Sequence, residues 1–310
     1  MSVLSTVEVF LETGLVFSII AMGYYISYHI LDFPDLTVEG TFLSGAVTFG
    51  LFASHGLNPW LGLLAALLVG GMFGTVTGIL HVALKIRPLL CGILVSTSLI
   101  TVNLIAVSAG IAGDFSGQAS SSISYGRTVK TLHDYFFGGA VPARINNIGV
   151  RDLLIFLLVT LACKVLLDLY LKTKSGLLLR AAGSNEQFVK MLGINPGVSK
   201  IIGLAIGNAC AAVSGALYTH ISGNVNQSMG IGTIVIGLAS LIIGMSLFGK
   251  AKFMKPTTKV ILGSIIYQAC LTAAQKLGVP SAYNKLIMAV MFTAAIVLSS
   301  REMKGGAKNA

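Results

Sequence analysis

Apolar runs of about twenty residues follow one another along most of this 310-residue chain. A helix needs about 20 apolar residues to cross the ~30 Å hydrocarbon core of a bilayer. Only 10% of the residues are charged, whereas an ordinary soluble domain is roughly one quarter charged. The sequence therefore predicts an all-α fold, a polytopic membrane helix bundle. It excludes a soluble enzyme, a nucleic-acid reader, a disordered scaffold and a β-barrel, whose strands are about ten residues long.

The apolar runs predict nine transmembrane helices, or ten if the region around 34–56 is split in two. All lie in a single transmembrane domain, residues 1–310. The segment 112–149 is a polar loop whose small apolar patch, 135–141, is a candidate re-entrant piece. The nine predicted spans are residues 9–31, 41–55, 59–84, 88–111, 150–171, 200–221, 229–249, 257–275 and 283–300.

The net charge of +10 predicts orientation rather than nucleic-acid binding. Lys and Arg gather in the cytoplasmic loops of membrane proteins. One set of loops holds 14 of the 21 basic residues, at 85–87, 172–200, 250–259 and 301–308. The C-terminus and the loop 172–199 are therefore expected in the cytoplasm, and the loop 112–149 outside. Nine crossings put the N-terminus outside and ten put it inside, and the sequence leaves both open.

Small residues recur at helical spacing along several spans. Helices in lipid associate through close backbone contact at such residues, so these stripes predict a tightly packed bundle. The stripes are Gly70, Gly74 and Gly78; Gly203, Gly207, Ala211 and Gly215; and Gly230, Gly237 and Gly244.

Ionisable groups are scarce inside the predicted spans. Lys164 and Asp168, four residues apart, are interpreted as a self-neutralising structural pair. No carboxylate suits the midplane site of an ion-driven carrier, and the four cysteines and the histidines lack metal-ligand spacing, so no metal site is expected. Gly244 to Lys250 matches most of a phosphate-binding loop but lacks its final hydroxyl, because residue 251 is alanine. The chain is therefore predicted to bind no cofactor and to hydrolyse no ATP.

The basic loop 172–199 contains a well-delimited short helix. Ser184 is the predicted N-cap, with Gln187 completing a capping box and Glu186 at the positive end of the helix dipole. Gly193 is the predicted stop, and Pro196 is expected to prevent the helix from resuming.

One face of this helix is apolar, with Phe188, Met191 and Leu192 at i, i+3 and i+4 spacing. A helix of two turns is not stable alone in water. The apolar face therefore needs either the inner surface of the bundle or a groove on another protein.

This loop resembles the coupling loop of bacterial ABC importer permeases, in the family that serves branched-chain amino acids, ribose-type sugars and nucleosides. The likeness rests on Gly183-Ser184-Asn185-Glu186 followed by Gly193-Ile194 and a span rich in small residues. Residues 35–40 are similar to a stretch after that family's first span, with Thr37 in place of its serine. Residues 32–37 and 229–237 resemble a branch usually paired with tryptophan- or tyrosine-type binding proteins. Phe188 or Val189 stands where family members commonly have alanine, which is expected to make the docking face bulkier.

The resemblance implies a type II ABC importer-like permease in a bacterial inner or plasma membrane, which passes a small solute to the cytoplasm. The solute is expected to be an aromatic or branched-chain amino acid, with a nucleoside or sugar left open. Partners would be cytoplasmic ABC ATPase subunits, which use the ATP, an extracytoplasmic solute-binding protein and a second permease copy in a homodimer. The residues expected to couple to the ATPase are Gly183, Ser184, Asn185, Glu186, Phe188, Leu192, Gly193 and Ile194.

Polar residues near or within the spans are candidates for the translocation pathway. The segment 32–40 places a proline, a glycine and three acids between two apolar runs, and such backbone is either unwound at membrane depth or a hydrated loop. The predicted pathway residues are Asp35, Thr37, Glu39, Asn103 and Asn208. An ion-coupled secondary transporter, which also has glycine-rich broken helices, is the alternative function.

Overall fold

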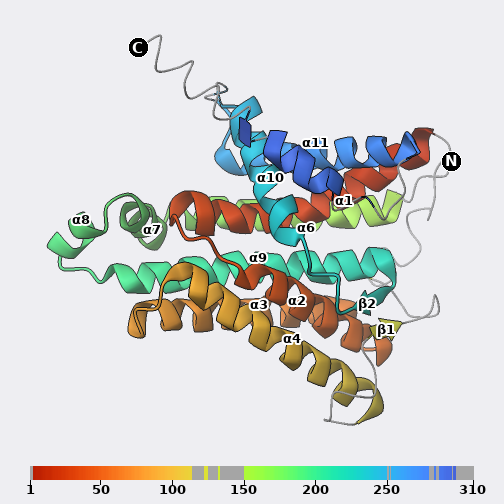
Figure 1. Ribbon diagram of the computed structural model, residues 1–310, viewed down its shortest axis with the longest axis horizontal. Coiled ribbons are helices and arrows are strands. Elements are labelled where there is room, and N and C mark those ends of the chain that lie inside the picture. The colour runs from red at the N-terminus through yellow and green to blue at the C-terminus, as the bar shows by residue number, and fades with distance from the viewer. Residues whose placement is uncertain are drawn as a thin grey trace.

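Helix α9 (Pro196–Ser222) runs through the middle of a bundle whose main helices lie along its long axis (Figure 1). The computed structural model describes residues 3–113, 122–124, 132, 150–249, 251, 253–278, 283, 286–294 and 296–297. The other elements are α1 (Val3–Tyr24), the π-helix η1 (Tyr25–Ile30), α2 (Thr37–Ser54), α3 (Pro59–Ala83), α4 (Pro88–Ala112), β1 (Ser122–Ser124), α6 (Val150–Tyr170), α7 (Lys174–Ser184), α8 (Glu186–Met191), β2 (Asn224–Asn226), α10 (Thr233–Leu247) and α11 (Pro256–Lys276).

Five of the nine predicted spans are long and apolar enough to cross a membrane in the part of the chain that the structure describes. They are Thr6–Ile30, Pro59–Ala83, Pro88–Ile111, Arg151–Tyr170 and Pro196–Ser222. The predicted span 41–55 is α2, which begins earlier, at Thr37. The predicted spans 229–249 and 257–275 are the shorter α10 and the less apolar α11. Residues 286–294 of the last predicted span are helical.

The start of α9 differs from the sequence-based expectation at Pro196. Proline was expected to keep a helix from resuming, but it is the first residue of α9, where a missing backbone N–H costs nothing. Asn195 caps this end, because its Oδ1 accepts a hydrogen bond from the Gly197 backbone N–H at 2.9 Å. α9 is therefore four residues longer at its start than the predicted span 200–221.

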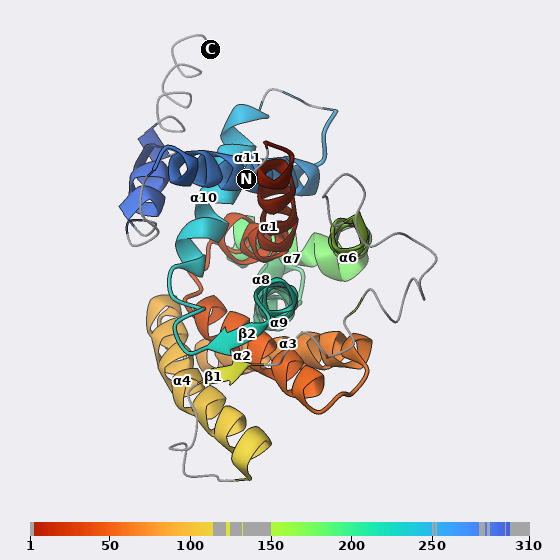
Figure 2. The same ribbon diagram turned by 90° about the vertical axis from the view of Figure 1, so that its right-hand side faces the viewer.

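Glycine stripes hold α9 against its neighbours, as the sequence predicts. A Cβ on Gly74 of α3 would overlap the carbonyl oxygen of Leu204, and one on Gly215 of α9 would overlap that of Phe42. Viewed down its axis, α9 lies between α1 on one side and α2 and α3 on the other (Figure 2). The prediction is wrong for Gly230, which lies in a turn before α10 rather than on its face.

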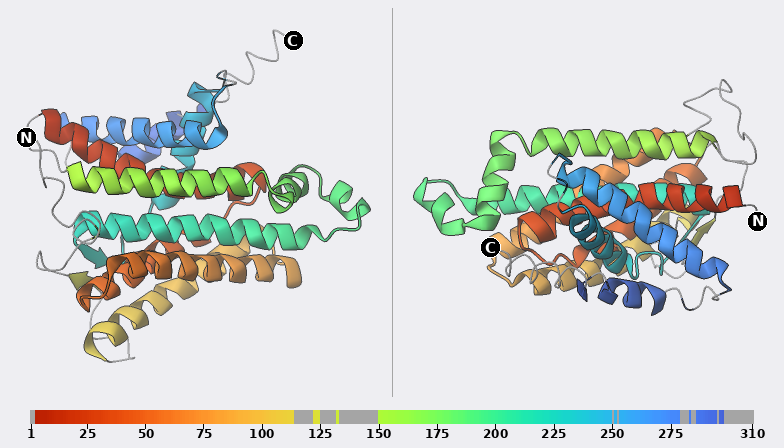
Figure 3. Two further views of the ribbon diagram at one scale, coloured as in Figure 1. Left: turned by 180° about the vertical axis from the view of Figure 1, so that it is seen from behind. Right: turned by 90° about the horizontal axis from the view of Figure 1, so that it is seen from above.

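The two ends of the bundle carry different structures. At one end α7 and α8 extend beyond α6 and α9, the helices that they connect (Figure 3). At the other end β1 and β2 form an antiparallel pair, with Ile123 opposite Val225, which the sequence analysis did not predict. The N-terminal end of α1 lies at the sheet end (Figure 1). Most of the loop 112–149, including the apolar patch 135–141, lies outside the described residues.

Candidate functional site

The chain is unwound between η1 and α2. Residues 31–36 leave the α7 end and turn back into the bundle (Figure 1). The amide of Phe33 donates to the Ser27 carbonyl at 2.8 Å, and Asp32 has a positive φ of 52°. Asp32 and Pro34 are exposed, whereas Phe33 and Asp35 are 3% and 1% exposed. The segment is thus unwound, with one edge exposed and the other enclosed by protein, and its depth in the membrane stays a prediction.

Asp35 is the centre of a buried polar cluster. Its Oδ1 accepts a hydrogen bond from the Thr37 backbone N–H at 2.9 Å, and its Oδ2 accepts one from Asn208 Nδ2 at 2.6 Å. Thr41 donates to Asn208 Oδ1 at 2.8 Å, and the Thr37 and Thr77 hydroxyls are 3.0 Å apart. All five side chains are at most 1% exposed. The cluster therefore fastens the unwound segment to α2, α3 and α9.

The other two predicted pathway residues lie along α2 and α4. Asn103 is buried and its Nδ2 donates to the Gly40 carbonyl at 3.3 Å. Glu39 is half-buried, its Oε1 accepts from the Gly232 backbone N–H at 2.8 Å, and it lines a cavity of about 300 Å³ with Gln227. Asp35, Thr37, Asn103 and Asn208 are enclosed by protein in this conformation, and a pathway role for all five stays a prediction.

The sequence analysis missed the hydroxyls of Thr41 and Thr77. Threonine is an ordinary residue in membrane helices, where it usually bonds to the carbonyl of the preceding turn. The only signal is that Thr37 and Thr41 are four residues apart and so share a helix face. The pairing of Thr37 with Thr77 on α3, and of Thr41 with Asn208 on α9, is visible only in the folded structure.

Two short helices, rather than one, form the predicted coupling loop. Ser184 was the predicted N-cap, but it is the last residue of α7, and its Oγ donates to the Ala181 carbonyl. The N-cap of α8 is Asn185, whose backbone is extended and whose Oδ1 accepts from the Phe188 backbone N–H at 3.0 Å. Asparagine is as good an N-cap residue as serine. Asn185 can therefore cap α8 while Ser184 remains the last residue of α7. The stop is as predicted, since Gly193 has a φ of +73°.

The apolar face of α8 is open to solvent. Phe188 is 52% exposed and Met191 84% exposed, while Val189 on the opposite side is fully buried. Leu192 and Ile194 extend the same surface and are 55% and 38% exposed. The bundle therefore covers only Val189 and leaves an apolar surface of four side chains, a kind of patch that marks interaction sites.

Glu186 attaches α8 to α9. Its carboxylate pairs with Lys200 at 2.7 Å and with Lys190 at 2.9 Å, and these hydrogen bonds, Lys200 first, lower the pKa of Glu186 to about 2. The pairs are complete above the ordinary pKa of 4.5 and are lost as the pH falls towards 2.

The prediction is that Glu186→Gln speeds hydrogen exchange in α8 at neutral pH, because the variant lacks the charge. The free energy of opening α8 should fall by less than about 1 kcal/mol, since the carboxylate is 42% exposed and screened by solvent. In the wild type, the loss of protection of α8 against exchange should begin only below pH 4.5, where protonation of Glu186 starts to weaken the ion pairs. Exchange mass spectrometry of the 186–194 segment measures both, and equal rates for wild type and variant at pH 7 would contradict the prediction.

Gly183 brings α7 into backbone contact with η1. A Cβ at Gly183 would overlap the Ile30 carbonyl oxygen, so only glycine fits without a shift. π-helical turns occur frequently at functional sites. This contact joins the loop that carries α8 to the start of the unwound segment 31–36.

We predict that Gly183→Ala destabilises the protein by about 1–3 kcal/mol, the usual cost of overpacking. Gly71→Ala is the control, because the nearest atom to its Cβ would be 3.8 Å away. That variant should be unchanged or more stable by up to about 1 kcal/mol. Thermal melting measures the stability of both variants, and equal stability of the two would contradict the role of the contact.

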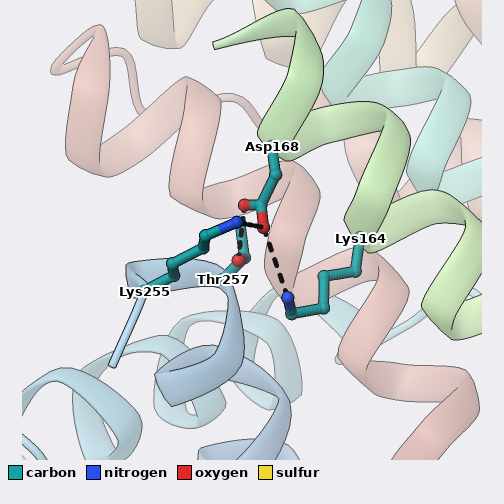
Figure 4. A network of polar contacts seen from close by, with 4 residues as sticks. All are labelled: Lys164, Asp168, Lys255 and Thr257. Atoms are coloured by element: carbon teal, nitrogen blue, oxygen red, sulfur yellow. Dashed lines mark hydrogen bonds and ion pairs between the residues drawn. The ribbon is translucent and has the colours of Figure 1, made fainter. Parts of the chain in front are cut away.

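The predicted Lys164–Asp168 pair belongs to a larger network (Figure 4). Asp168 Oδ2 accepts from Lys164 at 3.2 Å and from Lys255 at 3.1 Å, and Oδ1 accepts from Thr257 at 2.7 Å. The network fastens the end of α6 to the start of α11. Its structural role agrees with the interpretation from sequence, but two of its members come from a distant helix.

Three histidines near the span ends, His55, His81 and His220, lie within hydrogen-bond distance of their surroundings. His55 Nε2 lies 2.8 Å from the Gly110 carbonyl oxygen, His81 Nδ1 lies 2.8 Å from that of Ile86, and His220 Nε2 lies 3.3 Å from an Asp152 carboxylate oxygen. Among the described residues, no group of three or more His, Cys, Asp or Glu side chains could hold a metal ion.

Comparison with known proteins shows the family to which this chain belongs. The model of the family described as branched-chain amino acid transport system, permease component, matches residues 6–296. The chain belongs to this family. Its relatives include the tyrosine transport system permease protein of Clostridioides difficile, 40% identical over 281 residues, which are 91% of this chain and 87% of that one. A nucleoside ABC transporter permease protein of Lactococcus lactis is 27% identical, over 79% of this chain and 74% of the relative. An uncharacterized protein of Rickettsia prowazekii is 27% identical, over 94% of this chain and 97% of the relative. No solved structure matches the chain.

Family membership confirms the resemblance seen in residues 183–194. The protein is an all-α, multi-pass membrane permease of an ABC transport system. Permeases of this family work with ATPase and binding-protein partners, and the related chains are permease subunits rather than enzymes. The assignment favours the ATP-driven importer over an ion-coupled secondary transporter.

Proposed function

We propose that this permease passes an aromatic amino acid, with tyrosine as the first to test, from an extracytoplasmic binding protein to the cytoplasm. The observation that carries the substrate class is the 40% identity to the tyrosine transport system permease over 91% of the chain. The relatives named for other solutes are less similar, with 27% identity for the nucleoside permease.

We also propose that α8 is the contact for the ATPase. Three features support this role. The helix has its own cap at Asn185, it is held by Glu186 and Val189, and it presents Phe188 and Met191 to solvent. The α7–α8 end of the bundle would then face the cytoplasm, and the sheet end would face the binding protein. A homodimer, with a second copy of this chain, completes the proposed transporter, and ATP is bound only by the partner ATPase.

Movement at α8 would reach the pathway through Gly183. When the ATPases close on α8, α7 moves with it, and the contact between Gly183 and the Ile30 carbonyl transfers this movement to η1. The unwound segment 31–36 follows η1 directly and is fastened by Asp35 to α9. Tightly packed elements of this kind switch between discrete arrangements rather than deform continuously.

The test is uptake by the complete complex in proteoliposomes, with the binding protein outside and ATP inside. We expect tyrosine uptake that needs ATP and persists when proton and sodium gradients are dissipated. Uptake that continues without ATP but stops with the ion gradient would overturn the ATP-driven function. ATP-driven uptake of a nucleoside or a sugar, with none of tyrosine, would overturn the substrate class.

A further inference from the structure

Two adjoining cavities lie at the α7 end of the bundle. The larger, of about 680 Å³, is lined by η1, the start of the unwound segment, α7 and the first residue of α11. The smaller, of about 170 Å³, is lined by η1, α7, the end of α6 and the start of α11. Tyr25, Arg180 and Pro256 line both, so the two form one cleft, which we call the boundary cleft. None of the five predicted pathway residues lines it.

The boundary cleft lies where two membrane spans end. The apolar helices Thr6–Ile30 and Arg151–Tyr170 are long enough to cross a membrane, and both end beside the cleft. Tyr25 and Tyr28 line it from the last turns of the first span, and Lys172 follows the second span by two residues. Tyrosine is enriched at the membrane–water interface, where its ring lies at the level of the lipid headgroups. The group that meets the cleft in a membrane is therefore a phospholipid headgroup.

Basic side chains outnumber acidic ones in the cleft. Its charged lining residues are Asp32, Asp168, Lys172, Arg180 and Lys255. Asp168 is already neutralised, because it pairs with Lys255 at 3.1 Å and with a second lysine of the network in Figure 4. Asp32 lines only the larger cavity. The smaller cavity therefore carries uncompensated positive charge, which favours an anion.

Arg180 and Lys172 supply this charge. In the described part of the chain, neither side chain forms an ion pair or a hydrogen bond. Both are exposed, and Arg180 lines both cavities. The planar guanidinium of arginine carries five N–H donors in a fork that matches the oxygens of a phosphate group. This pair of cations therefore suits a phosphate group.

Tyr25 adds a hydrogen-bond donor where the two cavities meet. Its hydroxyl oxygen has no hydrogen-bond partner among the described residues and is not enclosed by them. The ring stacks on that of His29 at 5.4 Å and 24°, and both residues line the larger cavity. The stacking fixes the ring, and the hydroxyl is open to an acceptor oxygen in the cleft.

We propose that the boundary cleft binds the headgroup of an anionic phospholipid, with the phosphate in the smaller cavity. Arg180 and Lys172 contact the phosphate oxygens, and Tyr25 donates to one of them. The negative charge of Asp32 keeps the phosphate out of the larger cavity, which takes the uncharged remainder of the headgroup. There Asp32 and Ser184 accept hydrogen bonds from hydroxyl groups, such as those of the glycerol in phosphatidylglycerol. The inference rests on neither the solute nor the ATPase proposed above.

A bound lipid would brace the contact between α7 and η1. The cleft joins the end of α6 to α7, η1 and the start of α11, and Gly183, which contacts the Ile30 carbonyl, lines its larger cavity. A ligand that binds only the folded protein stabilises it by mass action. Anionic lipid should therefore raise the melting temperature of the permease.

The experiment titrates the purified full-length permease, in a neutral detergent, with phosphatidylglycerol and measures bound lipid by native mass spectrometry. We expect saturable binding to the wild type and about tenfold weaker binding to Arg180→Gln, as for loss of one hydrogen bond between charged groups. Without lipid, this variant should melt as the wild type does, because Arg180 is exposed and is bonded to none of the described residues.

Arg87→Gln is the matched control. Arg87 is also an exposed arginine at the α7 end, just before α4, but it lines neither cavity. This variant should bind phosphatidylglycerol with wild-type affinity. Phosphatidylethanolamine, which has no net charge, and inorganic phosphate are titrated in parallel, and both should bind the wild type at least tenfold more weakly than phosphatidylglycerol.

Each other outcome contradicts a separate step. Equal affinity of the wild type and Arg180→Gln for phosphatidylglycerol would overturn the site. Phosphatidylethanolamine that binds as tightly would overturn the preference for an anionic headgroup. If inorganic phosphate binds as tightly in an Arg180-dependent way, the phosphate site is correct and its lipid source is wrong. If Arg180→Gln keeps its lipid affinity but no longer co-purifies with the ATPase, the cleft is a protein contact and not a lipid site. The lipid titrations use neither tyrosine nor ATP, so their failure would leave the proposed transport function standing.

Discussion

Replacing Phe188 by aspartate is expected to abolish solute uptake and the stimulation of ATP hydrolysis by the binding protein. Phe188 is 52% exposed on an apolar surface that the described bundle does not cover. Buried aromatic anchors in interfaces are commonly worth 2 kcal/mol or more, which corresponds to a loss of about 30-fold or more in affinity. A carboxylate at this position would in addition lose its hydration inside an apolar interface. Both effects act on assembly with the ATPase and not on the bundle.

The same variant should fold normally, because α8 keeps its Asn185 cap, its Glu186 ion pairs and the buried Val189. Phe188→Leu should retain most activity. Phe253→Asp is the control for a charge on an exposed phenylalanine, since Phe253 is 89% exposed and lies outside α8. Uptake, ATP hydrolysis and co-purification of the ATPase are the measurements. A Phe188→Asp permease that still binds the ATPase and transports at the wild-type rate would show that α8 is not the coupling contact.

Removing the Asp35 carboxylate should produce the largest loss of stability among these variants. Asp35→Ala leaves two buried N–H groups without an acceptor, the Thr37 backbone N–H and one of the two N–H groups of Asn208 Nδ2, whose other hydrogen bond goes to the Leu204 carbonyl. Each unsatisfied buried group costs about 1–3 kcal/mol, so the expected loss is about 2–5 kcal/mol. Asn208→Ala should also destabilise, because it removes a charge-assisted hydrogen bond from a carboxylate that is 1% exposed.

The effects of these two substitutions on the free energy of unfolding should not be additive. The double variant Asp35→Ala/Asn208→Ala removes both partners at once, so we expect a coupling of about 1–3 kcal/mol between them. Asn103→Ala is the matched control, since it is another buried asparagine with one hydrogen bond, to Gly40. It should cost about 1 kcal/mol and show no coupling to Asp35. Unfolding in denaturing detergent gives the free energies, and strictly additive losses would mean that the buried cluster is not a connected unit.

Measuring uptake as well as stability for alanine variants of the predicted pathway residues separates structural from transport roles. If alanine at Asp35, Thr37, Glu39, Asn103 and Asn208 changes stability but never the rate of uptake by the folded protein, the pathway prediction is wrong. A change of uptake confined to Glu39 would place the pathway at the cavity that this residue lines.

The sequence by itself determined the fold class, the family and the place of a short capped helix between α7 and α9. Crossing a bilayer requires about twenty apolar residues in a row, and that requirement is visible in a linear chain. Helix stops and close-packing stripes are equally local, which is why Gly193 and the Gly70, Gly74 and Gly78 stripe lie where the sequence places them. Where two local signals competed, the prediction failed: Asn185 rather than Ser184 caps α8.

Only the tertiary structure decided which polar groups meet. Asp35 and Asn208 are 173 residues apart in sequence, and Asp168 gains two of its three partners from α11. The short sheet likewise joins distant segments, with Ile123 opposite Val225. Helical spacing reports which residues share a face, but it carries no information about the helix that faces them. That information arises when the helices pack, because close contact at glycine and the satisfaction of each buried donor select one arrangement among many.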